Sequence, residues 1–287
     1  MRKIWKITVA LAGLLAATAG WAAGAPPRTE TMAEKTLKEI VARQRDILAK
    51  ADKEGDQLDV ARLRGELQSV INSYDVLIQK NPDFAPAYVT YGMLLGQVGM
   101  TREAVGILLK ANKLEPNLPL VKNEIGRHLA EDGKLVEALP WIMAAIDLEP
   151  KEPLYHYHLG KLLTEGRDDF IKTGQFTRPA LDQAMLDAFR RAAELAPGDL
   201  SLSYRYAKAY FATEPPRTQE VLPVLDELES RATKPSMKQL VRLRRAEAFL
   251  KLGRRDEART QLDGVTELQL AQEKQTLLDQ LAKAGEK

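Results

Sequence analysis

A pattern of small, large and turn residues lies between residues 81 and 116, and the same pattern recurs between residues 115 and 150. The pairs related by this constant offset are Tyr91 and Ile125, Gly92 and Gly126, Leu95 and Leu129, Gly99 and Gly133, Ala104 and Ala138, Leu108 and Ile142, Ala111 and Ala145, and Pro116 and Pro150. One copy of this length cannot bury its apolar residues alone, so several copies must stack. The spacing therefore predicts an all-α array of helix pairs.

Each copy contains two helical patterns separated by a turn. In the first pattern, residues four apart such as Tyr91 and Leu95 lie on one helix face. A glycine inside a helix costs about 1 kcal/mol relative to alanine, so the glycine that recurs beside them predicts close contact with the second helix. Gly99 and Gly133 predict turns with a left-handed backbone, and the closing prolines end the second helices.

These residues resemble the tetratricopeptide repeat family. The resemblance implies a right-handed superhelical solenoid of antiparallel helix pairs with helical caps, which binds protein or peptide partners on its concave face. About four recognisable copies lie within 82–265. The predicted segments are an N-terminal helical pair or cap at 24–81, repeats at 82–116, 117–150, 151–197, 198–235 and 236–265, and a C-terminal capping helix at 266–287.

The third copy is longer than the first two. Its repeat positions are Gly160, Leu163, Ala192 and Pro197. The closing positions arrive later than the offset requires, which predicts an inserted loop at 165–178 between the two helices. Because insertions in solenoids lie on one face, Phe170 and Phe176 of this loop predict either a weaker partner contact or packing onto their own repeat. The second interpretation is favoured, since large aromatic side chains are usually covered.

The chain opens with three basic residues, Arg2, Lys3 and Lys6. An apolar run at 7–19 and a series of small residues follow them. This order is typical of a secretory signal peptide, and the run is short for a membrane-spanning helix. We therefore expect export to the periplasm, with residues 1–23 as the signal peptide and cleavage after Ala22 or Ala23. The alternative is an uncleaved segment that anchors the chain to the inner membrane.

Composition limits the possible partners. Residues 1–22 hold three of the 42 Lys and Arg and none of the 40 Asp and Glu, so the remainder has a formal net charge of −1. Nucleic acids and anionic lipids require an excess of basic residues gathered on one surface, so we expect no nucleic acid, and membrane contact only through an uncleaved signal peptide. The chain has no cysteine, which excludes disulfides and thiolate metal sites.

Residues suited to catalysis are few. The histidines are His128, His156 and His158, and the last two are two apart on a predicted helix, which points them to different faces. No HExxH, GxSxG, Walker or dinucleotide glycine motif occurs. Asp168 and Asp169 could form a hydrolytic pair with a histidine, but a solvated acidic turn is favoured because loop acids are mostly exposed. We expect no enzyme, no cofactor and no metal, and keep a hydrolytic enzyme as a minor alternative.

The family that this chain resembles lines its concave groove with the first helix of each copy. The residues after the recurrent glycine position are Met93, Arg127, Lys161, Lys208 and Glu247, and those one turn earlier are Val89, Asn123, Tyr157, Tyr204 and Leu243. The predicted partner-binding residues are Asn123, Arg127, Tyr157, Lys161, Tyr204, Arg205 and Lys208. Cations beside aromatic rings suit an acidic peptide or a C-terminal carboxylate. The alternative is a solvated basic stripe paired with Glu124 and Glu131, which would contribute little energy.

Two functions remain open at this point. The first is a binding scaffold or adaptor of the cell envelope. Chaperone-binding members of the family hold a C-terminal carboxylate with a lysine and asparagine arrangement that this chain does not reproduce, since Met93 follows the first glycine. The second is a self-associating structural component of an envelope assembly, which an exposed apolar stripe on Leu37, Ile40 and Ile47 would favour.

Overall fold

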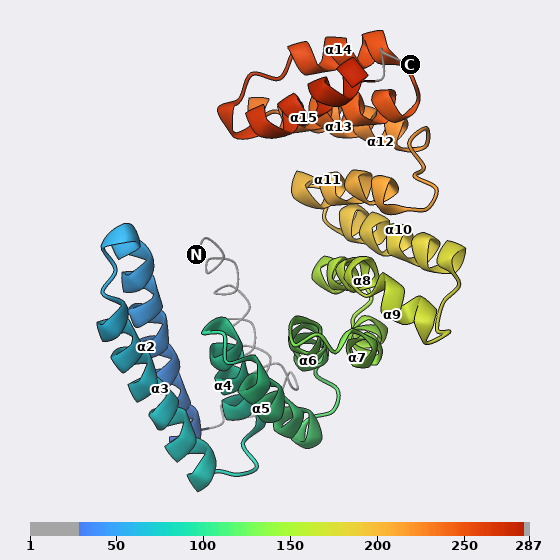
Figure 1. Cartoon of the computed structure of the whole chain (residues 1–287). Helices are drawn as coiled ribbons and strands as arrows, with labels where there is room; N and C mark the ends of the chain where they lie inside the picture. The colour runs from blue at the N-terminus through green and yellow to red at the C-terminus, as the bar shows by residue number, and fades with distance from the viewer. Residues whose placement is uncertain (1–28, 284–287) are drawn as a thin grey trace. The chain divides into compact units, whose positions relative to one another are not determined.

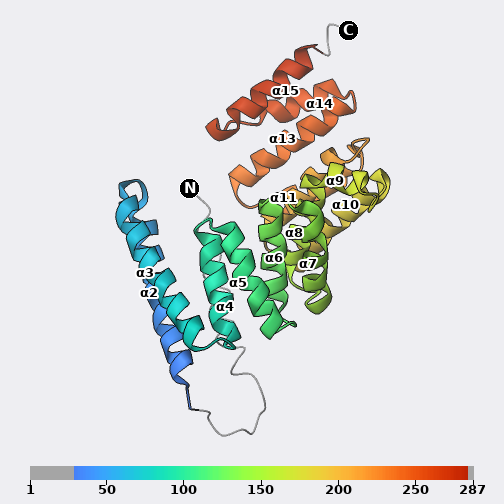
Figure 2. The same cartoon turned by 60° about the horizontal axis from the view of Figure 1, so that its bottom comes forward.

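The computed structural model describes residues 29–283, in which the chain forms helices and turns and no strand (Figures 1 and 2). The all-α prediction is confirmed for this range. The predicted signal peptide, residues 1–23, lies outside it. The chain divides into two compact units: unit 1 ends at Leu148 and unit 2 begins at Glu149. In each unit, most helices pack as antiparallel pairs, as the repeat predicts.

The described part of unit 1 consists of three helix pairs. Their helices are α2 (Met32–Glu54), α3 (Val60–Lys80), α4 (Ala85–Gln97), α5 (Thr101–Leu114), α6 (Pro119–Glu131) and α7 (Leu135–Leu148). Thr31 and Glu34 form a capping box at the start of α2, and the side chain of Asp59 caps α3. The rings of Tyr74 on α3 and Tyr91 on α4 are stacked with centroids 5.1 Å apart, so the N-terminal pair packs directly on the first repeat.

The apolar stripe that would favour self-association faces the core of unit 1. Leu37 is 1% exposed and Ile40 is 7% exposed, and Ile47 is partly buried against the same cluster. These side chains pack against α3 because α2 places them on one face at helical spacing. These three side chains therefore do not form the exposed apolar stripe that would favour self-association in an envelope assembly.

Glycine turns join the helices of a pair. Gly99 has a φ of 84° and Gly133 a φ of 80°, which confirms the predicted left-handed backbone. The amide of Met100 donates to the carbonyl oxygen of Leu95 at 2.9 Å, and the second copy repeats this bond. This is the bonding pattern of a helix that ends at a left-handed glycine.

The recurrent glycine inside each first helix allows the second helix to approach. A Cβ atom added to Gly92 or Gly126 would lie 2.6 Å from a side-chain carbon of the second helix, and one added to Gly160 would lie 2.9 Å from the ring of Phe189. Real Cβ atoms do not approach neighbours so closely. The predicted packing role of these glycines is confirmed.

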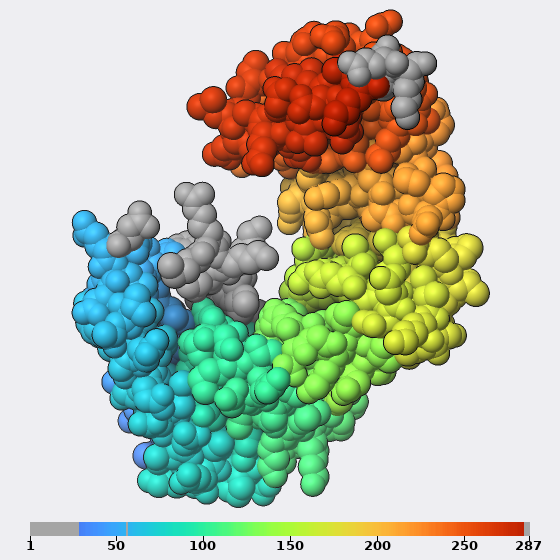
Figure 3. Space-filling model, in the orientation of Figure 1, coloured from blue at the N-terminus to red at the C-terminus, as the bar shows by residue number. Residues whose placement is uncertain are grey.

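The described part of unit 2 runs from α8 to α15. Its helices are α8 (Pro153–Glu165), α9 (Arg167–Lys172), α10 (Arg178–Leu195), α11 (Leu200–Ala209), α12 (Val221–Arg231), α13 (Pro235–Lys251), α14 (Arg255–Asp263) and α15 (Ala271–Lys283). Helix α10 packs between α8 and α11, and α12 packs between α11 and α13. Helix α15 covers the end of this stack (Figure 3). Its residues Leu277 and Leu281 are buried against α13 and α14.

The inserted segment of the third copy is more ordered than the predicted loop. Residues 167–172 form helix α9, and Gly174 turns the chain with a φ of 73° before α10. Phe170 is 0% exposed and packs edge to face with Phe176, with ring centroids 5.9 Å apart. The predicted weaker partner contact is therefore wrong for Phe170, because the short helix turns this ring into its own repeat. Phe176 is only partly exposed.

Candidate functional site

The predicted partner-binding residues fall on first helices in both units. Asn123 and Arg127 lie on α6 of unit 1. Tyr157 and Lys161 lie on α8 of unit 2, and Tyr204, Arg205 and Lys208 lie on α11 of unit 2. The two groups differ in what their charged side chains contact, so we describe each unit separately.

In unit 1, carboxylates of the same helix neutralise Arg127. Its guanidinium lies 2.6 Å from a carboxylate oxygen of Glu124, three residues earlier, and 2.7 Å from one of Glu131, four residues later. Asn123 is 0% exposed, and its amide donates to Glu124 at 3.3 Å. The paired alternative predicted from the sequence thus describes Arg127, whose charge is already balanced within α6.

A buried histidine completes this network. His128 is 0% exposed, with Nε2 at 2.9 Å from a terminal guanidinium nitrogen of Arg127 and Nδ1 at 3.1 Å from a carboxylate oxygen of Glu131. Because arginine can only donate, Nε2 accepts and the ring proton is on Nδ1, which donates to Glu131. This hydrogen bond is the main reason that the pKa of Glu131 falls from 4.5 to about 2, against a smaller opposing effect of burial.

Gly96 makes room for this histidine, although the repeat pattern does not include it. A Cβ atom on Gly96 of α4 would lie 2.1 Å from Nε2 of His128. The imidazole of α6 therefore rests directly on the backbone of α4. Together, Gly96, His128 and the charged residues around Arg127 join neighbouring helix pairs of unit 1, which is a structural role.

In unit 2, the guanidinium of Arg205 is held by aromatic rings. Its central carbon lies 5.9 Å from the ring centroid of Tyr157 on α8 and 5.7 Å from that of Phe189 on α10. The Nε atom is buried and has no hydrogen-bond partner within the described residues. Cation–π contacts of this kind orient the guanidinium without neutralising it.

Lys208 lies three residues after Arg205 on the same face of α11 and is exposed. Burial of its stem lowers the pKa of the Lys208 ammonium, and the positive charges of Arg244 and Arg205 lower it further. Within residues 29–283, neither Arg205 nor Lys208 forms an ion pair with a carboxylate. The surface of α11 therefore carries two cations in a positive local potential.

Arg244 of α13 extends this positive surface but is already occupied. It is 6% exposed and donates to the hydroxyl of Tyr204 at 2.8 Å. It also pairs with the carboxylates of Glu247 on α13 and Glu273 on α15. At the other end of the surface, Lys161 lies 3.7 Å from Glu165. Among the cations of this surface, the two on α11 are therefore the ones that no carboxylate of the described chain neutralises.

The sequence analysis missed Arg244, although the register contains a signal for it. Tyr204, Arg205 and Lys208 correspond to Leu243, Arg244 and Glu247 in the next copy. Comparing the position of Arg205 across copies would have found Arg244. The partner Glu273 could not be found in this way, because it belongs to the capping helix and not to the repeat.

We name the α11 residues Tyr204, Arg205 and Lys208, together with Tyr157 and Lys161 of α8, the α8–α11 surface. It combines aromatic rings with cations, of which two are unpaired within the described residues. Such a surface suits an anionic group carried by a larger ligand, since the charge can form charge-assisted hydrogen bonds and the rings can pack against the chain beside it.

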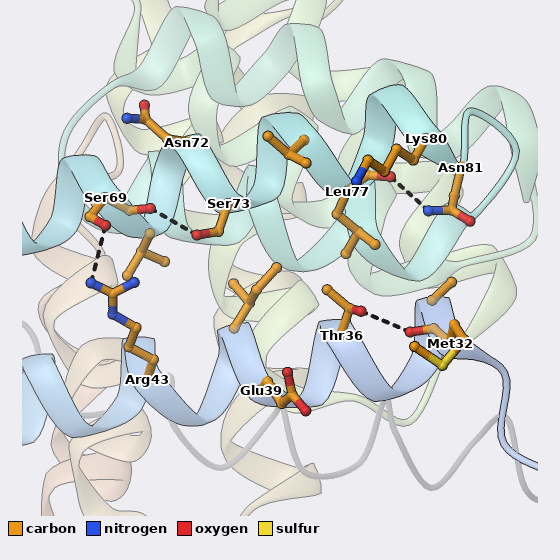
Figure 4. A pocket seen from close by; sticks show the side chains of 14 residues that line it. Met32, Thr36, Glu39, Arg43, Ser69, Asn72, Ser73, Leu77, Lys80 and Asn81 are labelled. Carbon is orange, nitrogen blue, oxygen red and sulfur yellow. Dashed lines mark hydrogen bonds between the residues drawn. The ribbon is translucent and has the colours of Figure 1, made fainter.

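A hollow lies between α2 and α3 of unit 1 (Figure 4). Its apolar lining includes Ile40, Val70 and Leu77, and Arg43 donates to the hydroxyl of Ser69 at 3.1 Å on its rim. The sequence analysis did not single it out. None of the predicted partner-binding residues lines it.

Groups that could hold a metal ion do not gather in the described range. No set of three or more His, Asp or Glu residues that could hold a metal ion occurs in residues 29–283. His156 makes a different contact from His128: its Nε2 atom lies 2.9 Å from the carbonyl oxygen of Pro150. Over the same range, no helix has both the length and the apolar character needed to cross a bilayer.

Comparison with solved structures identifies the fold. No model of a protein family matches the sequence, and no curated protein matches it. The structure resembles MamA from residue 41 to its end, from Desulfovibrio magneticus RS-1, with a TM-score of 0.51 and 14% identity over 68% of this chain and 94% of that one. Another crystal structure of MamA matches with a TM-score of 0.50 and 15% identity over 68% and 91%.

A third similar structure is the APC/C hetero-tetramer Cut9–Hcn1. It has a TM-score of 0.50 and 15% identity, and the match covers 98% of this chain and 50% of that one. These neighbours are tetratricopeptide repeat proteins. At such identities the likeness concerns the fold alone, and it confirms that the helix pairs of this chain are of the tetratricopeptide type.

Proposed function

We propose that this protein is a non-catalytic binding scaffold of the cell envelope, and that it holds acidic protein or peptide segments on the α8–α11 surface. One observation carries the proposal. Arg205 and Lys208 have no carboxylate partner within the described residues, whereas Arg127, Arg244 and Lys161 each have at least one. Unpaired cations beside aromatic rings are what an acidic ligand requires.

The fold supports the same proposal in a general way. Stacked helix pairs present a long row of first-helix side chains, which is suited to contact with an extended chain. The sequence prediction placed Arg127 among the binding cations. We now assign Arg127 to the internal network of α6, so the expected contact is concentrated on unit 2.

Location in the envelope remains a proposal that rests on the sequence. The basic residues at the start and the apolar run at 7–19 support export by a signal peptide. Mass spectrometry of the exported protein should find a mature chain that begins near Ala23 or Gly24. An intact Met1 on protein that pellets with membranes would favour the anchored alternative.

The binding proposal can be tested by comparing two matched triple variants. The first replaces Lys161, Arg205 and Lys208 with glutamine, and the second replaces the exposed cations Lys172, Lys238 and Lys251. Both lose three charges. Immobilised wild-type protein and the control triple should capture the same partner from envelope extract, and the first triple should lose it.

The binding energy at stake is substantial. Hydrogen bonds to charged groups contribute about 1.5–3 kcal/mol each and do not add fully, so the loss should be at least ~2 kcal/mol. Capture should also weaken as salt rises, because exposed charges are screened. A partner retained by the first triple at high salt would refute the proposal, and so would equal losses in the two triples.

A further inference from the structure

The carboxylates of unit 2 are distributed unevenly over its cations. Arg244 holds two of them, one from its own helix and one from α15, while the α11 cations hold none within the described range. We infer that Arg205 and Lys208 form a subsite for a single carboxylate side chain of a peptide, and that Glu273 limits the subsite to α11 by occupying Arg244. This inference rests on the proposed function and specifies its ligand.

Arg205 is positioned before any ligand arrives. Contacts with the rings of Tyr157 and Phe189 fix the guanidinium from two helices, so little side-chain entropy remains to be lost on binding. Gly160 permits this arrangement, since a Cβ atom there would lie 2.9 Å from the Phe189 ring. The repeat glycine thus also places the ring that supports the subsite.

Lys208 supplies the second charge at close range. A separation of three positions on a helix places its stem beside that of Arg205. The pKa of Lys208 is lowered by burial first and then by Arg244 and Arg205, while Glu247 opposes this effect. A carboxylate bound between the two cations would relieve the repulsion and raise the pKa of Lys208, which gives the subsite a measurable signature.

Glu273 sets the boundary of the subsite. Its side chain is 45% exposed on the capping helix, yet its carboxylate pairs with the 8% exposed side chain of Arg244. An acidic residue of the protein itself therefore fills the cationic position next to Lys208. A peptide with one carboxylate can use α11, and a second carboxylate finds Arg244 taken.

A peptide carboxylate fits this surface better than a free anion. The rings of Tyr157 and Tyr204 lie beside the cations and offer contact area to the chain that carries the acid. A free anion would use the charges alone. Phosphate could engage the same cations, so phosphorylated peptide and free anion serve as separate arms of the test.

The test is an NMR titration, at low ionic strength, of the protein that begins at Gly24. The ligands are short peptides of alanine and glycine. The peptides carry one glutamate, two glutamates, one glutamine or one phosphoserine, and acetate is the free anion. For the one-glutamate peptide, Lys208→Gln and Arg205→Gln should each weaken binding about ten-fold. The control Lys238→Gln removes a cation of α13 that is outside the subsite, and it should not weaken binding. Binding of the glutamine peptide and acetate should be weaker by a similar factor.

The second glutamate separates the boundary from the subsite. A peptide with two glutamates has a statistical advantage because either glutamate can enter the subsite. Beyond that factor, the second glutamate should change the affinity for the wild-type protein less than two-fold, whereas it should strengthen binding to Glu273→Gln about five-fold or more. Equal gains in both proteins would overturn the inference and leave the proposed function standing. Stronger binding of the phosphoserine peptide than of the one-glutamate peptide would assign the subsite to phosphate and overturn it as well.

A ligand-free readout distinguishes failure of the inference from failure of the proposed function. Glu273→Gln leaves Arg244 with one carboxylate fewer, so the pKa of Lys208, followed by its side-chain NMR signals, should fall further. An unchanged pKa would refute the electrostatic boundary whatever the peptides do. If the pKa falls but no acidic peptide binds any variant, the proposed function and the subsite both fail.

Discussion

Replacing Gly126 with alanine tests the packing on which the helix pairs depend. The added Cβ atom would lie 2.6 Å from Cγ1 of Ile142, 3.1 Å from the carbonyl oxygen of Ala138 and 3.2 Å from the amide nitrogen of Ile142. Two of these neighbours are backbone atoms of α7, so a side-chain rotation cannot relieve the contact. The helices α6 and α7 must move apart by a few tenths of an ångström.

Gly106 provides the matched control. It lies inside α5, is exposed, and has no heavy atom within 4 Å of an added Cβ. Alanine should therefore stabilise the protein at this position by up to about 1 kcal/mol through helix propensity alone. The same gain applies at Gly126 but is opposed by overpacking of about 1–3 kcal/mol. The two variants should differ in unfolding free energy by about 1–3 kcal/mol, with Gly126→Ala the less stable.

Urea unfolding followed by tryptophan fluorescence can measure this difference where it arises. A protein that starts at Gly24 lacks Trp5 and Trp21, which leaves Trp141 as the one tryptophan of the chain. Trp141 lies on α7, next to Ile142, so its signal reports on the helix pair under test. Unfolding midpoints that shift equally, and in the same direction, for Gly126→Ala and Gly106→Ala would refute the assigned contact.

Two further predictions concern the buried groups of each unit. In unit 1, the pKa of Glu131 lies at about 2 because of its hydrogen bond from His128 and its pair with Arg127, so this carboxylate adds stability above pH about 4.5 that is lost as the pH falls towards 2. The stability difference between wild type and Glu131→Gln, measured by urea unfolding, should therefore shrink from pH 5 to pH 2, and a constant difference would contradict the assignment. In unit 2, Phe170→Ala should cost about 3–5 kcal/mol because the ring is 0% exposed, whereas Phe176→Ala should cost less. If thermal unfolding shows that the two phenylalanine variants lose equally little stability, α9 does not pack on its repeat.

The helix pairs could be predicted from the sequence because their determinants are local and recur. The turn at Gly99 needs a left-handed residue two positions after a helix end, and the contact at Gly92 needs a small residue opposite a large one. Both requirements fall at fixed positions within each copy, so the second copy verifies the first. Helix boundaries follow from these residues with little help from tertiary structure.

Contacts outside the repeat could not be predicted in the same way. Gly96 corresponds to Ala130 in the next copy, so its contact with His128 has no periodic signal. The pairing of Arg244 with Glu273 joins two helices that are distant in the sequence through the packing of the capping helix. Burial of Phe170 depends on the formation of α9, a short helix whose sequence resembles an acidic turn.

The difference between the paired and unpaired cations can nevertheless be traced to spacing along single helices. Arg127 has glutamates three residues before it and four residues after it, and both distances place a carboxylate within reach on a helix. Lys161 has one glutamate, four residues later.

Arg205 and Lys208 have no acidic residue at any of these positions, where the chain has Ser201, Leu202, Tyr204 and Ala209 among others. A cation without a carboxylate three or four positions away keeps its charge for another element or for a ligand. On α13, Arg244 has Glu247 three positions later and also receives Glu273 from α15, whereas on α11 no element of the described chain supplies a carboxylate. The same rule that makes Arg127 a structural residue thus leaves the α11 cations available to a partner.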